Sequence, residues 1–258
     1  MSSGSNKAFN FTKAKMLLGS ALKEKPDVVC FPEVFLYSGT EEFLNALDIG
    51  SEEVLFFREQ AKKFSVNLVL GSVSLKTKGG KVTNSCLVID RKGKIVFRYD
   101  KMFMYDVVRP ELVFRESDSV VPGKELGLCK IDGVTVGLGI CVDLRYPEYF
   151  RALVFRGAKA IFLPSSFRKA TGSLAWNVLT KARAIENQVY FCACDTTGSE
   201  GNRERCGRTR IVSFNGEILS EVESEEWYAV AELDFDKQEN FRKEFPILQQ
   251  KKFEIKKK

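Results

Sequence analysis

The sequence predicts an α/β protein in which two β-sheets are faced by helices. Segments that read as strands, several of them paired through short turns, alternate along the chain with segments of helical spacing. The chain has 258 residues, 44% of them hydrophobic, which is enough for one large domain with a substantial core. Because neither an internal repeat nor a linker is visible, we expect a single domain over residues 1–258.

The chain begins with a polar stretch, residues 1–9, which we expect to be disordered. Residues 12–23 then have the spacing of an amphipathic helix. Pro26-Asp27 ends this helix and leads into a short apolar strand that ends at Glu33. A second helix and three strands are expected at residues 51–64, 67–75, 83–90 and 94–100.

The alternation continues after an irregular stretch at residues 102–130, whose length is typical of a functional loop. A buried strand at 134–140 is followed by a helix at 147–156. Asn215-Gly216 indicates a hairpin between two late strands. The other expected strands are 160–163, 189–194, 209–214, 217–222 and 227–233, with helices at 173–187 and 236–243 and a basic tail at 250–258.

Composition narrows the classes of function. Much of the net charge of +6 lies in the tail at residues 250–258, which we interpret as a solvated end rather than a nucleic-acid-binding face. No apolar run reaches the roughly 20 residues of a membrane span. No signal peptide is visible, so we expect a cytoplasmic protein. The seven cysteines form neither a disulfide framework nor a zinc-ligand pattern. We therefore expect neither a metal nor a cofactor.

The segment from Val134 to Glu148 places Cys141 between the end of a buried strand and the start of a helix. A thiol on such an elbow is presented like a nucleophile, with backbone N–H groups nearby, although a lone cysteine is more often a small buried hydrophobe. The chain has no histidine, which excludes Cys–His and Ser–His–Asp sites. A catalytic Cys141 therefore needs a carboxylate or a lysine as its base.

Two other strand ends supply these groups. Val28-Val-Cys-Phe-Pro-Glu33 ends in a glutamate, and Ile95-Val-Phe-Arg-Tyr-Asp-Lys101 ends in a lysine. Each is weak evidence alone, because ionisable residues at strand ends often face solvent. Three strand ends that deliver a glutamate, a lysine and a cysteine form a coherent active-site layer, as expected where one sheet edge carries function.

These segments closely resemble, in order and spacing, the three motifs of the nitrilase superfamily, the carbon–nitrogen hydrolases. They are Phe31-Pro-Glu33, Lys101 with the following Met-Phe-Met-Tyr-Asp, and Gly139-Ile-Cys-Val-Asp-Leu-Arg-Tyr-Pro-Glu148. The likeness runs from about Asn10 to about Phe245 and is closest to the omega-amidase-like branch. It implies a four-layer α-β-β-α sandwich, usually assembled into a homodimer or higher homo-oligomer through helix contacts beside the cysteine elbow.

In similar proteins a strand precedes the first helix. Here too few apolar residues precede residue 12 to form one. Either the first sheet lacks this edge strand, or the start of the sequence is truncated or misassigned. The first of these would alter the wall of the site beside Glu33.

The resemblance implies a thiol amidohydrolase that cleaves a small carboxamide to an acid and ammonia through a thioester, and we expect the carboxamide to be the ω-amide of a dicarboxylate. In this reading Cys141 is the nucleophile, and Lys101 lowers its pKa and then stabilises the oxyanion together with the backbone N–H of Val142. Glu33 serves as general acid and base. Glu116 matches the second glutamate that similar proteins place beside the lysine, and a surface-loop glutamate is the alternative.

Arg145 and Tyr146 follow the nucleophile in a form that, in similar proteins, accompanies amide substrates bearing a carboxylate. We predict that both bind substrate and that Arg145 clamps the carboxylate, with an internal pair to Asp143 or Glu148 as the alternative. The chain departs from the family pattern at Phe103 and at Gly207-Arg-Thr209, where relatives often carry histidine. A nitrilase and an N-carbamoyl amidase are the alternatives among enzymes. An inactive scaffold or binding protein and a thiol redox protein are the alternatives from other classes.

Overall fold

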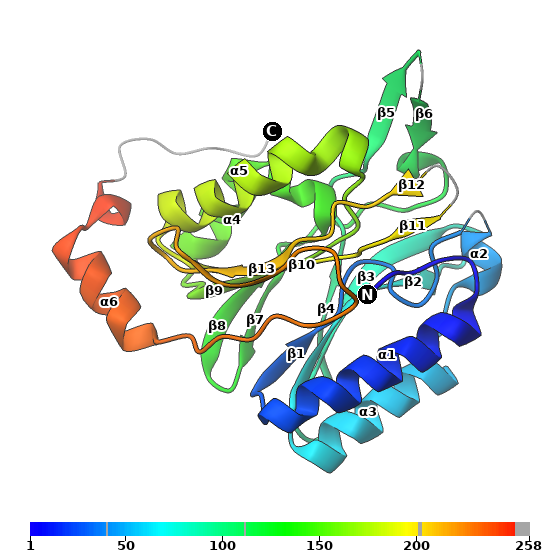
Figure 1. Cartoon of the computed structure of the whole chain (residues 1–258), viewed down its shortest axis with the longest axis horizontal. Coiled ribbons are helices and arrows are strands. Elements are labelled where there is room, and N and C mark those ends of the chain that lie inside the picture. Colours follow the sequence, from blue (N-terminus) through cyan, green and yellow to red (C-terminus); the bar gives the residue numbers. More distant parts are fainter. Residues whose placement is uncertain (40, 111, 201–202, 251–258) are drawn as a thin grey trace.

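The computed structural model describes residues 1–258 except 40, 111, 201–202 and 251–258. Within the described residues the chain is a mixed α/β protein with two main sheets and with helices on their outer faces (Figure 1). This architecture confirms the predicted α-β-β-α sandwich. Apart from Gln250, the expected basic tail lies outside the described residues.

The first sheet has the strand order β1-β2-β3-β4, with β1 parallel to β2 and the other pairs antiparallel. Its outer face is covered by α1 and α3, the blue and cyan helices of Figure 1. Asn6 caps α1 by accepting the N–H of Phe9 at 3.0 Å, so the helix includes residues 7–9, which we expected to be disordered. The elements of this half are α1 (Lys7–Ala21), η1 (Leu22–Glu24), β1 (Val28–Cys30), α2 (Glu42–Asn45), α3 (Glu52–Phe64), β2 (Asn67–Lys76), β3 (Val82–Ile89) and β4 (Ile95–Asp100).

The second sheet has six strands in the order β14-β13-β10-β9-β8-β7. Its central strands β8, β9 and β10 are parallel, and α4 and α5 cover its outer face (Figure 1). The elements are β7 (Leu128–Ile131), β8 (Val134–Leu138), η3 (Cys141–Arg145), α4 (Pro147–Phe155), β9 (Ala160–Ser165), α5 (Lys169–Asn187), β10 (Tyr190–Asp195), β13 (Thr209–Val212), β14 (Ile218–Val222), α6 (Phe235–Glu244) and η4 (Ile247–Gln249).

The core explains part of the unusual phenylalanine content. Phe31, Phe35 and Phe57 are all buried between α3 and the first sheet, and the rings of Phe31 and Phe35 stack with 4.6 Å between centroids. Such aromatic pairs stabilise a core beyond simple area burial. Because Phe31 and Phe35 lie on either side of Glu33, this packing also anchors the loop that carries the glutamate.

The stretch at 102–130 is more regular than predicted. It contains a projecting hairpin, β5 (Asp106–Arg109) and β6 (Leu112–Arg115), followed by the 3₁₀ helix η2 (Glu116–Asp118). A second short pair, β11 (Ser199–Glu200) and β12 (Arg203–Glu204), lies between β10 and β13. Both pairs depend on cross-strand contacts that local propensity does not encode.

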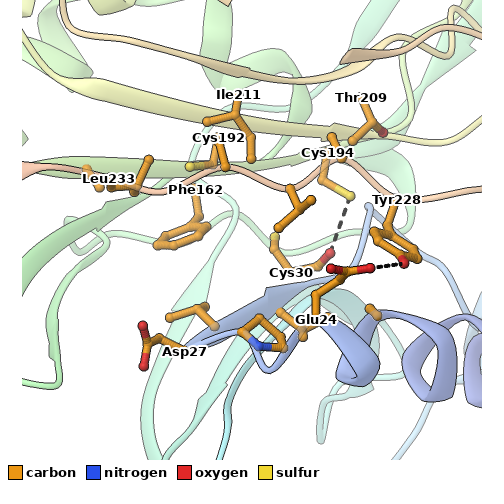
Figure 2. A pocket seen from close by; sticks show the side chains of 18 of the residues that line it. Glu24, Asp27, Cys30, Phe162, Cys192, Cys194, Thr209, Ile211, Tyr228 and Leu233 are labelled. Carbon is orange, nitrogen blue, oxygen red and sulfur yellow. Dashed lines mark hydrogen bonds between the residues drawn. The ribbon is translucent and has the colours of Figure 1, made fainter. Parts of the chain in front are cut away.

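No strand precedes α1 in the described residues, and the edge of β1 away from β2 has no neighbouring strand. A cavity of about 960 Å³ lies at this edge (Figure 2). Residues 227–233, predicted as a strand, line the cavity without joining a sheet. A strand forms only where its backbone groups can pair with a neighbouring strand. At this edge of β1 the carbonyl of Cys30 instead accepts a hydrogen bond from the thiol of Cys194, at 3.5 Å (Figure 2).

None of the helices within the described ranges combines the length and the apolar character that crossing a bilayer requires.

Candidate active site

Cys141 follows the end of β8 after Gly139 and Ile140, and it opens η3. Its φ is 49°, in the left-handed region that non-glycine residues rarely occupy. The conformation is held by its neighbours, because Asp143 accepts the N–H of Ile140 at 2.8 Å and donates its own N–H to the carbonyl of Ile140 at 3.0 Å. The elbow therefore presents the thiol at a fixed position, where the residue is 7% exposed.

Asp143 is the structural residue of this elbow. Besides Ile140, its carboxylate accepts the hydroxyl of Tyr99 at 2.7 Å and the N–H of Phe103 at 3.1 Å. Burial raises the pKa of Asp143 to about 6 from 3.8, although the hydrogen bonds from Ile140 and Tyr99 oppose this shift. Asp143 thus ties the nucleophile elbow to the segment that follows Lys101.

Glu33 follows β1 and is positioned by contacts between the two sheets. Its N–H donates to the carbonyl of Ser165 at 3.3 Å, and the next residue, Val34, donates to Ser72 Oγ at 2.9 Å. Gly71 permits this approach, because a Cβ on Gly71 would overlap the carbonyl oxygen of Phe31. Only glycine fits at a position where two backbones come so close.

Lys101 lies between two carboxylates. Its Nζ is 2.8 Å from Glu33 Oε1 and 2.8 and 2.9 Å from the two carboxylate oxygens of Glu116. Burial opposes the charged form, but Glu116 and Glu33 outweigh it and raise the pKa of Lys101 well above its usual value. The ammonium therefore stays protonated at neutral pH, as an oxyanion-stabilising group must.

Two groups that the sequence did not indicate support this cluster. Asn84 in β3 donates Nδ2 to Glu33 at 2.9 Å and to Glu116 at 3.3 Å. The backbone N–H of Tyr105 donates to Glu116 Oε2 at 2.7 Å. Glu116 is 8% exposed and is therefore not the surface glutamate of the alternative interpretation.

The thiol of Cys141 completes the arrangement. Burial, and then the carboxylate of Glu33, raise the pKa of Cys141 well above its usual value, while Lys101 and a backbone hydrogen bond from Ser166 oppose the shift. The free site therefore holds a neutral thiol beside a carboxylate that can accept its proton. Lys101 lowers the pKa of the thiol, as we expected, but burial and Glu33 outweigh the ammonium, so the net pKa is raised.

These residues line a cavity of about 380 Å³. Of the predicted site residues, Glu33, Lys101, Glu116, Cys141, Val142 and Arg145 line it, and Tyr146 does not. Tyr146 instead stacks on Phe103, with ring centroids 3.6 Å apart and planes 9° from parallel. Residues missed from the sequence include Asn84, Tyr105, Ser166, Arg168 and Arg205. They come from separate loops and strands, and no local motif marks them.

Arg145 forms neither of the internal pairs that we considered. Its Nη2 donates to the carbonyl of Thr171 at 3.0 Å, and its guanidinium lies 5.7 Å from the ring centroid of Phe167. Asp143 is fully buried and already bound by Tyr99 and backbone N–H groups. Arg145 thus faces the cavity with donors to spare. Among the described residues, no group of three or more His, Cys, Asp or Glu could hold a metal ion.

Comparisons with known proteins agree with this geometry. The family model described as carbon–nitrogen hydrolase matches residues 1–243. The chain is 31% identical to the omega-amidase NIT3 of Saccharomyces cerevisiae, covering 98% of this chain and 91% of that protein. It is 32% identical to the deaminated glutathione amidase of Dictyostelium discoideum, covering 98% and 91%.

Solved structures show the same fold. The crystal structure of S. cerevisiae Nit3, a member of branch 10 of the nitrilase superfamily, has a TM-score of 0.88 at 29% identity, covering 98% of this chain and 93% of that one. The C. elegans NitFhit protein has a TM-score of 0.92 at 28% identity, and the chain spans 63% of its length while 97% of this chain is covered. The chain therefore belongs to the carbon–nitrogen hydrolase family and is an amidohydrolase of the omega-amidase-like branch of the nitrilase superfamily.

Proposed function

We propose that this amidohydrolase cleaves the ω-amide of a small dicarboxylate to the acid and ammonia through a thioester on Cys141. The observation that carries the proposal is the buried cluster of Glu33, Lys101 and Glu116 beside a thiol that is held on a left-handed elbow. A carboxylate base, a fixed ammonium and a thiol are sufficient for amide hydrolysis without histidine or metal.

In the first half-reaction, Glu33 takes the proton of the Cys141 thiol, and the sulfur attacks the amide carbon. A C–S bond forms, and the carbonyl oxygen becomes an oxyanion that Lys101 and the N–H of Val142 stabilise. The C–N bond then breaks, and Glu33 transfers the proton to the departing nitrogen. Ammonia leaves, and the acyl group remains on the sulfur as a thioester.

In the second half-reaction, Glu33 takes a proton from a water molecule that attacks the thioester carbon. The C–S bond breaks, the acid leaves, and the proton returns to the sulfur. One water is consumed for each amide cleaved. Because Glu116 binds Lys101 through both oxygens, we assign it the positioning of the ammonium through the whole cycle.

The choice of a dicarboxylate ω-amide is supported by Arg145 and by the relatives. Arg145 lines the cavity four residues after the nucleophile and retains free donors. The two relatives described above are named an omega-amidase and a deaminated glutathione amidase. A nitrilase or an N-carbamoyl amidase with the same residues remains the alternative for the substrate class.

We further propose a homodimer built through α5 beside the elbow. Leu174, Val178 and Ile185 lie along one face of this helix and are 79%, 54% and 49% exposed. Three apolar side chains along one exposed helix face are typical of an interface. We also propose that the protein is cytoplasmic, because all seven cysteines are free and the cytoplasm keeps thiols reduced.

The test is ammonia release from a panel of dicarboxylate ω-amides, neutral amides, N-carbamoyl amines and nitriles, with Cys141→Ala as the blank. Release that depends on Cys141 and is fastest with an ω-amide supports the proposal. Release by Cys141→Ala at the rate of the unsubstituted protein contradicts the thioester route. A faster reaction with a nitrile or an N-carbamoyl amine would reassign the substrate class.

A further inference from the structure

A second group of thiols lies outside the cavity around Cys141. Cys30 in β1 and Cys192 and Cys194 in β10 all line the cavity of about 960 Å³ at the free edge of β1. Figure 2 shows the side chain of Cys194 directed from β10 toward Cys30. Both residues are half-buried, and the proposed amide hydrolysis uses neither of them.

Cys30 and Cys194 are in direct contact, although they are 164 positions apart in the sequence. The thiol of Cys194 donates to the carbonyl oxygen of Cys30 at 3.5 Å. The two thiols also interact, because a hydrogen bond from the Cys30 thiol lowers the pKa of Cys194 while burial opposes the shift. The same hydrogen bond, together with burial, raises the pKa of Cys30 well above its usual value. A thiol that ionises readily thus lies beside one that keeps its proton, as in pairs of an attacking and a resolving cysteine.

The cavity gives small molecules a route to this pair. Asp27 and Trp227 also line it, and both are exposed to solvent, Trp227 to 53%. Hydrogen peroxide has only two heavy atoms, so it can reach the thiols through this opening. Cys86, in contrast, is fully buried in the core and is not among the residues that line the cavity.

The strand that carries Cys30 is held on one side only. In the described structure β1 pairs with β2, and its three residues are all half-buried. A disulfide requires Cβ atoms about 3.5–4.5 Å apart. A short strand without a second neighbour adjusts to that distance at a lower cost than a central strand, because fewer ladder hydrogen bonds must move.

We propose that Cys30 and Cys194 form an oxidative modification site, at which a peroxide converts the two thiols to a disulfide between the two sheets. The Cys194 thiolate attacks one oxygen of the peroxide, so an S–O bond forms and the O–O bond breaks. The hydroxide released takes up a proton and leaves as water. The Cys30 sulfur then attacks the sulfenic acid of Cys194, the S–S bond forms, the S–O bond breaks, and a second water leaves with the proton of Cys30. The two thiols lose two electrons, and hydrogen peroxide gains them.

The disulfide joins β1 of the first sheet to β10 of the second. It closes a long loop, and a cross-link of this kind stabilises a fold mainly by restricting the unfolded chain. We expect the melting temperature of the oxidised protein to rise by roughly 5 to 15 °C. In a compartment that keeps thiols reduced such a bond is transient, because a dithiol reductant returns it to two thiols.

The experiment treats the reduced protein with a slight molar excess of hydrogen peroxide. Acid stops the reaction, the remaining thiols are blocked, and the peptides are mapped by mass spectrometry. We expect a disulfide-linked pair of peptides that joins Cys30 to Cys194 and disappears after treatment with dithiothreitol. Thermal unfolding of the oxidised and reduced samples measures the predicted shift.

Cys192→Ser is the matched control. Cys192 lies on the same strand and lines the same cavity, but burial raises its pKa to about 12, so it stays a thiol. We expect Cys192→Ser to form the disulfide as the original protein does, and Cys194→Ser to lose it. Cys30→Ser should leave a sulfenic acid on Cys194 that dimedone labels. Dimedone should not label Cys30 in Cys194→Ser, since that thiol keeps its proton.

Cys141→Ala shows whether the pair reacts independently of the nucleophile, and it should form the disulfide to the same extent as the original protein. Loss of the disulfide in Cys141→Ala would overturn the proposal, because the peroxide would then react first at the nucleophile. A bridge to Cys192, or no bridge in the original protein, would overturn it as well. None of these measurements uses amide hydrolysis, so the modification site and the proposed function stand or fall separately.

Discussion

Lys101 and Glu33, which are 68 positions apart in the sequence, form a buried ion pair with 2.8 Å between Nζ and Oε1. The pair links the end of β4 to the loop after β1, two strands at opposite edges of the same sheet. Removing one partner of a buried pair leaves an uncompensated charge, which is costly. The geometry of the site and the stability of the first sheet therefore depend on the same contact.

Glu33→Gln separates two effects of this carboxylate on Cys141: it accepts the thiol proton as the general base, and it raises the pKa of the thiol. We expect turnover to fall by at least about 100-fold, because the general base is lost. We also expect Cys141 to be alkylated at lower pH than in the original protein, because Glu33 raises the pKa of the thiol and Lys101 lowers it. Mass spectrometry of iodoacetamide-treated protein over a pH series measures this. Alkylation shifted to higher pH would contradict the assignment.

Lys101→Met leaves Glu33 and Glu116 together without their common cation. We expect the free energy of unfolding to decrease by about 3–5 kcal/mol, the usual cost of breaking a buried ion pair from one side. Urea unfolding at pH 7 measures the difference. Lys124→Met, at an exposed position with no ion pair in the described structure, should change it little. Similar effects of the two substitutions would show that the cluster does not stabilise the fold.

Asp143 gives a pH dependence whose sign follows from burial. Its pKa is raised from 3.8 to about 6 in the folded protein, so the carboxyl binds a proton more tightly when folded than when unfolded. The corresponding stability is fully present below about pH 4 and is lost as the pH rises through about 6. We expect the difference in the free energy of unfolding between the original protein and Asp143→Asn to fall between about pH 4 and about pH 6, and to be constant at higher pH.

Asp132→Asn is the opposite control for that experiment. Its hydrogen bond with Arg91 lowers the pKa of Asp132, so its stabilising contribution is lost as the pH falls. The two variants should therefore depart from the original protein with opposite slopes in urea unfolding at a series of pH values. A flat difference for Asp143→Asn would show that this carboxyl does not titrate in that window.

Gly71→Ala tests the close approach that positions Glu33. The added Cβ would overlap the carbonyl oxygen of Phe31 and lie against Pro164, so the end of β1 must move. We expect the rate of amide hydrolysis to fall strongly, because Glu33 moves. The melting temperature should change little, because much of the core is retained. Gly79→Ala, which has open space around its Cβ position, should leave both unchanged. Activity assays and thermal unfolding compare them, and full activity in Gly71→Ala would contradict the argument.

Arg145→Ala tests the acyl-side clamp. We expect KM to rise by about 10- to 100-fold for amides that bear a carboxylate on the acyl group, because a charged hydrogen-bonded contact is lost. Amides with a neutral acyl group should be affected much less. Steady-state kinetics with a matched pair, such as the monoamide of glutarate and butyramide, measures the difference. An equal rise for both would remove Arg145 from substrate recognition.

The sequence by itself indicated Glu33, Lys101, Glu116 and Cys141, and the structure brings these four together. Three of them follow strand ends inside short motifs, which are local signals. β1 and β4 belong to the first sheet and β8 to the second, so the packing of the two sheets, and not one sheet edge, brings Cys141 to Glu33 and Lys101. The order of strands and helices was readable for a similar reason, because hydrophobic period and turn residues are local signals. Asp143 could also be assigned to the elbow from its position two residues after the nucleophile.

Tertiary structure decided everything that depends on partners distant in the sequence. Residues 227–233 have the composition of a strand but pair with no strand in the described structure, whereas the β5–β6 hairpin forms inside the stretch at 102–130 that we expected to be an irregular loop. Asn84 and Arg205 reach the cavity only because the fold brings β3 and the loop after β12 to it. Tyr146 lies outside the predicted site because its ring stacks on the ring of Phe103. Hydrogen-bond partners, burial and charge balance belong to the packed chain, and a linear pattern does not contain them.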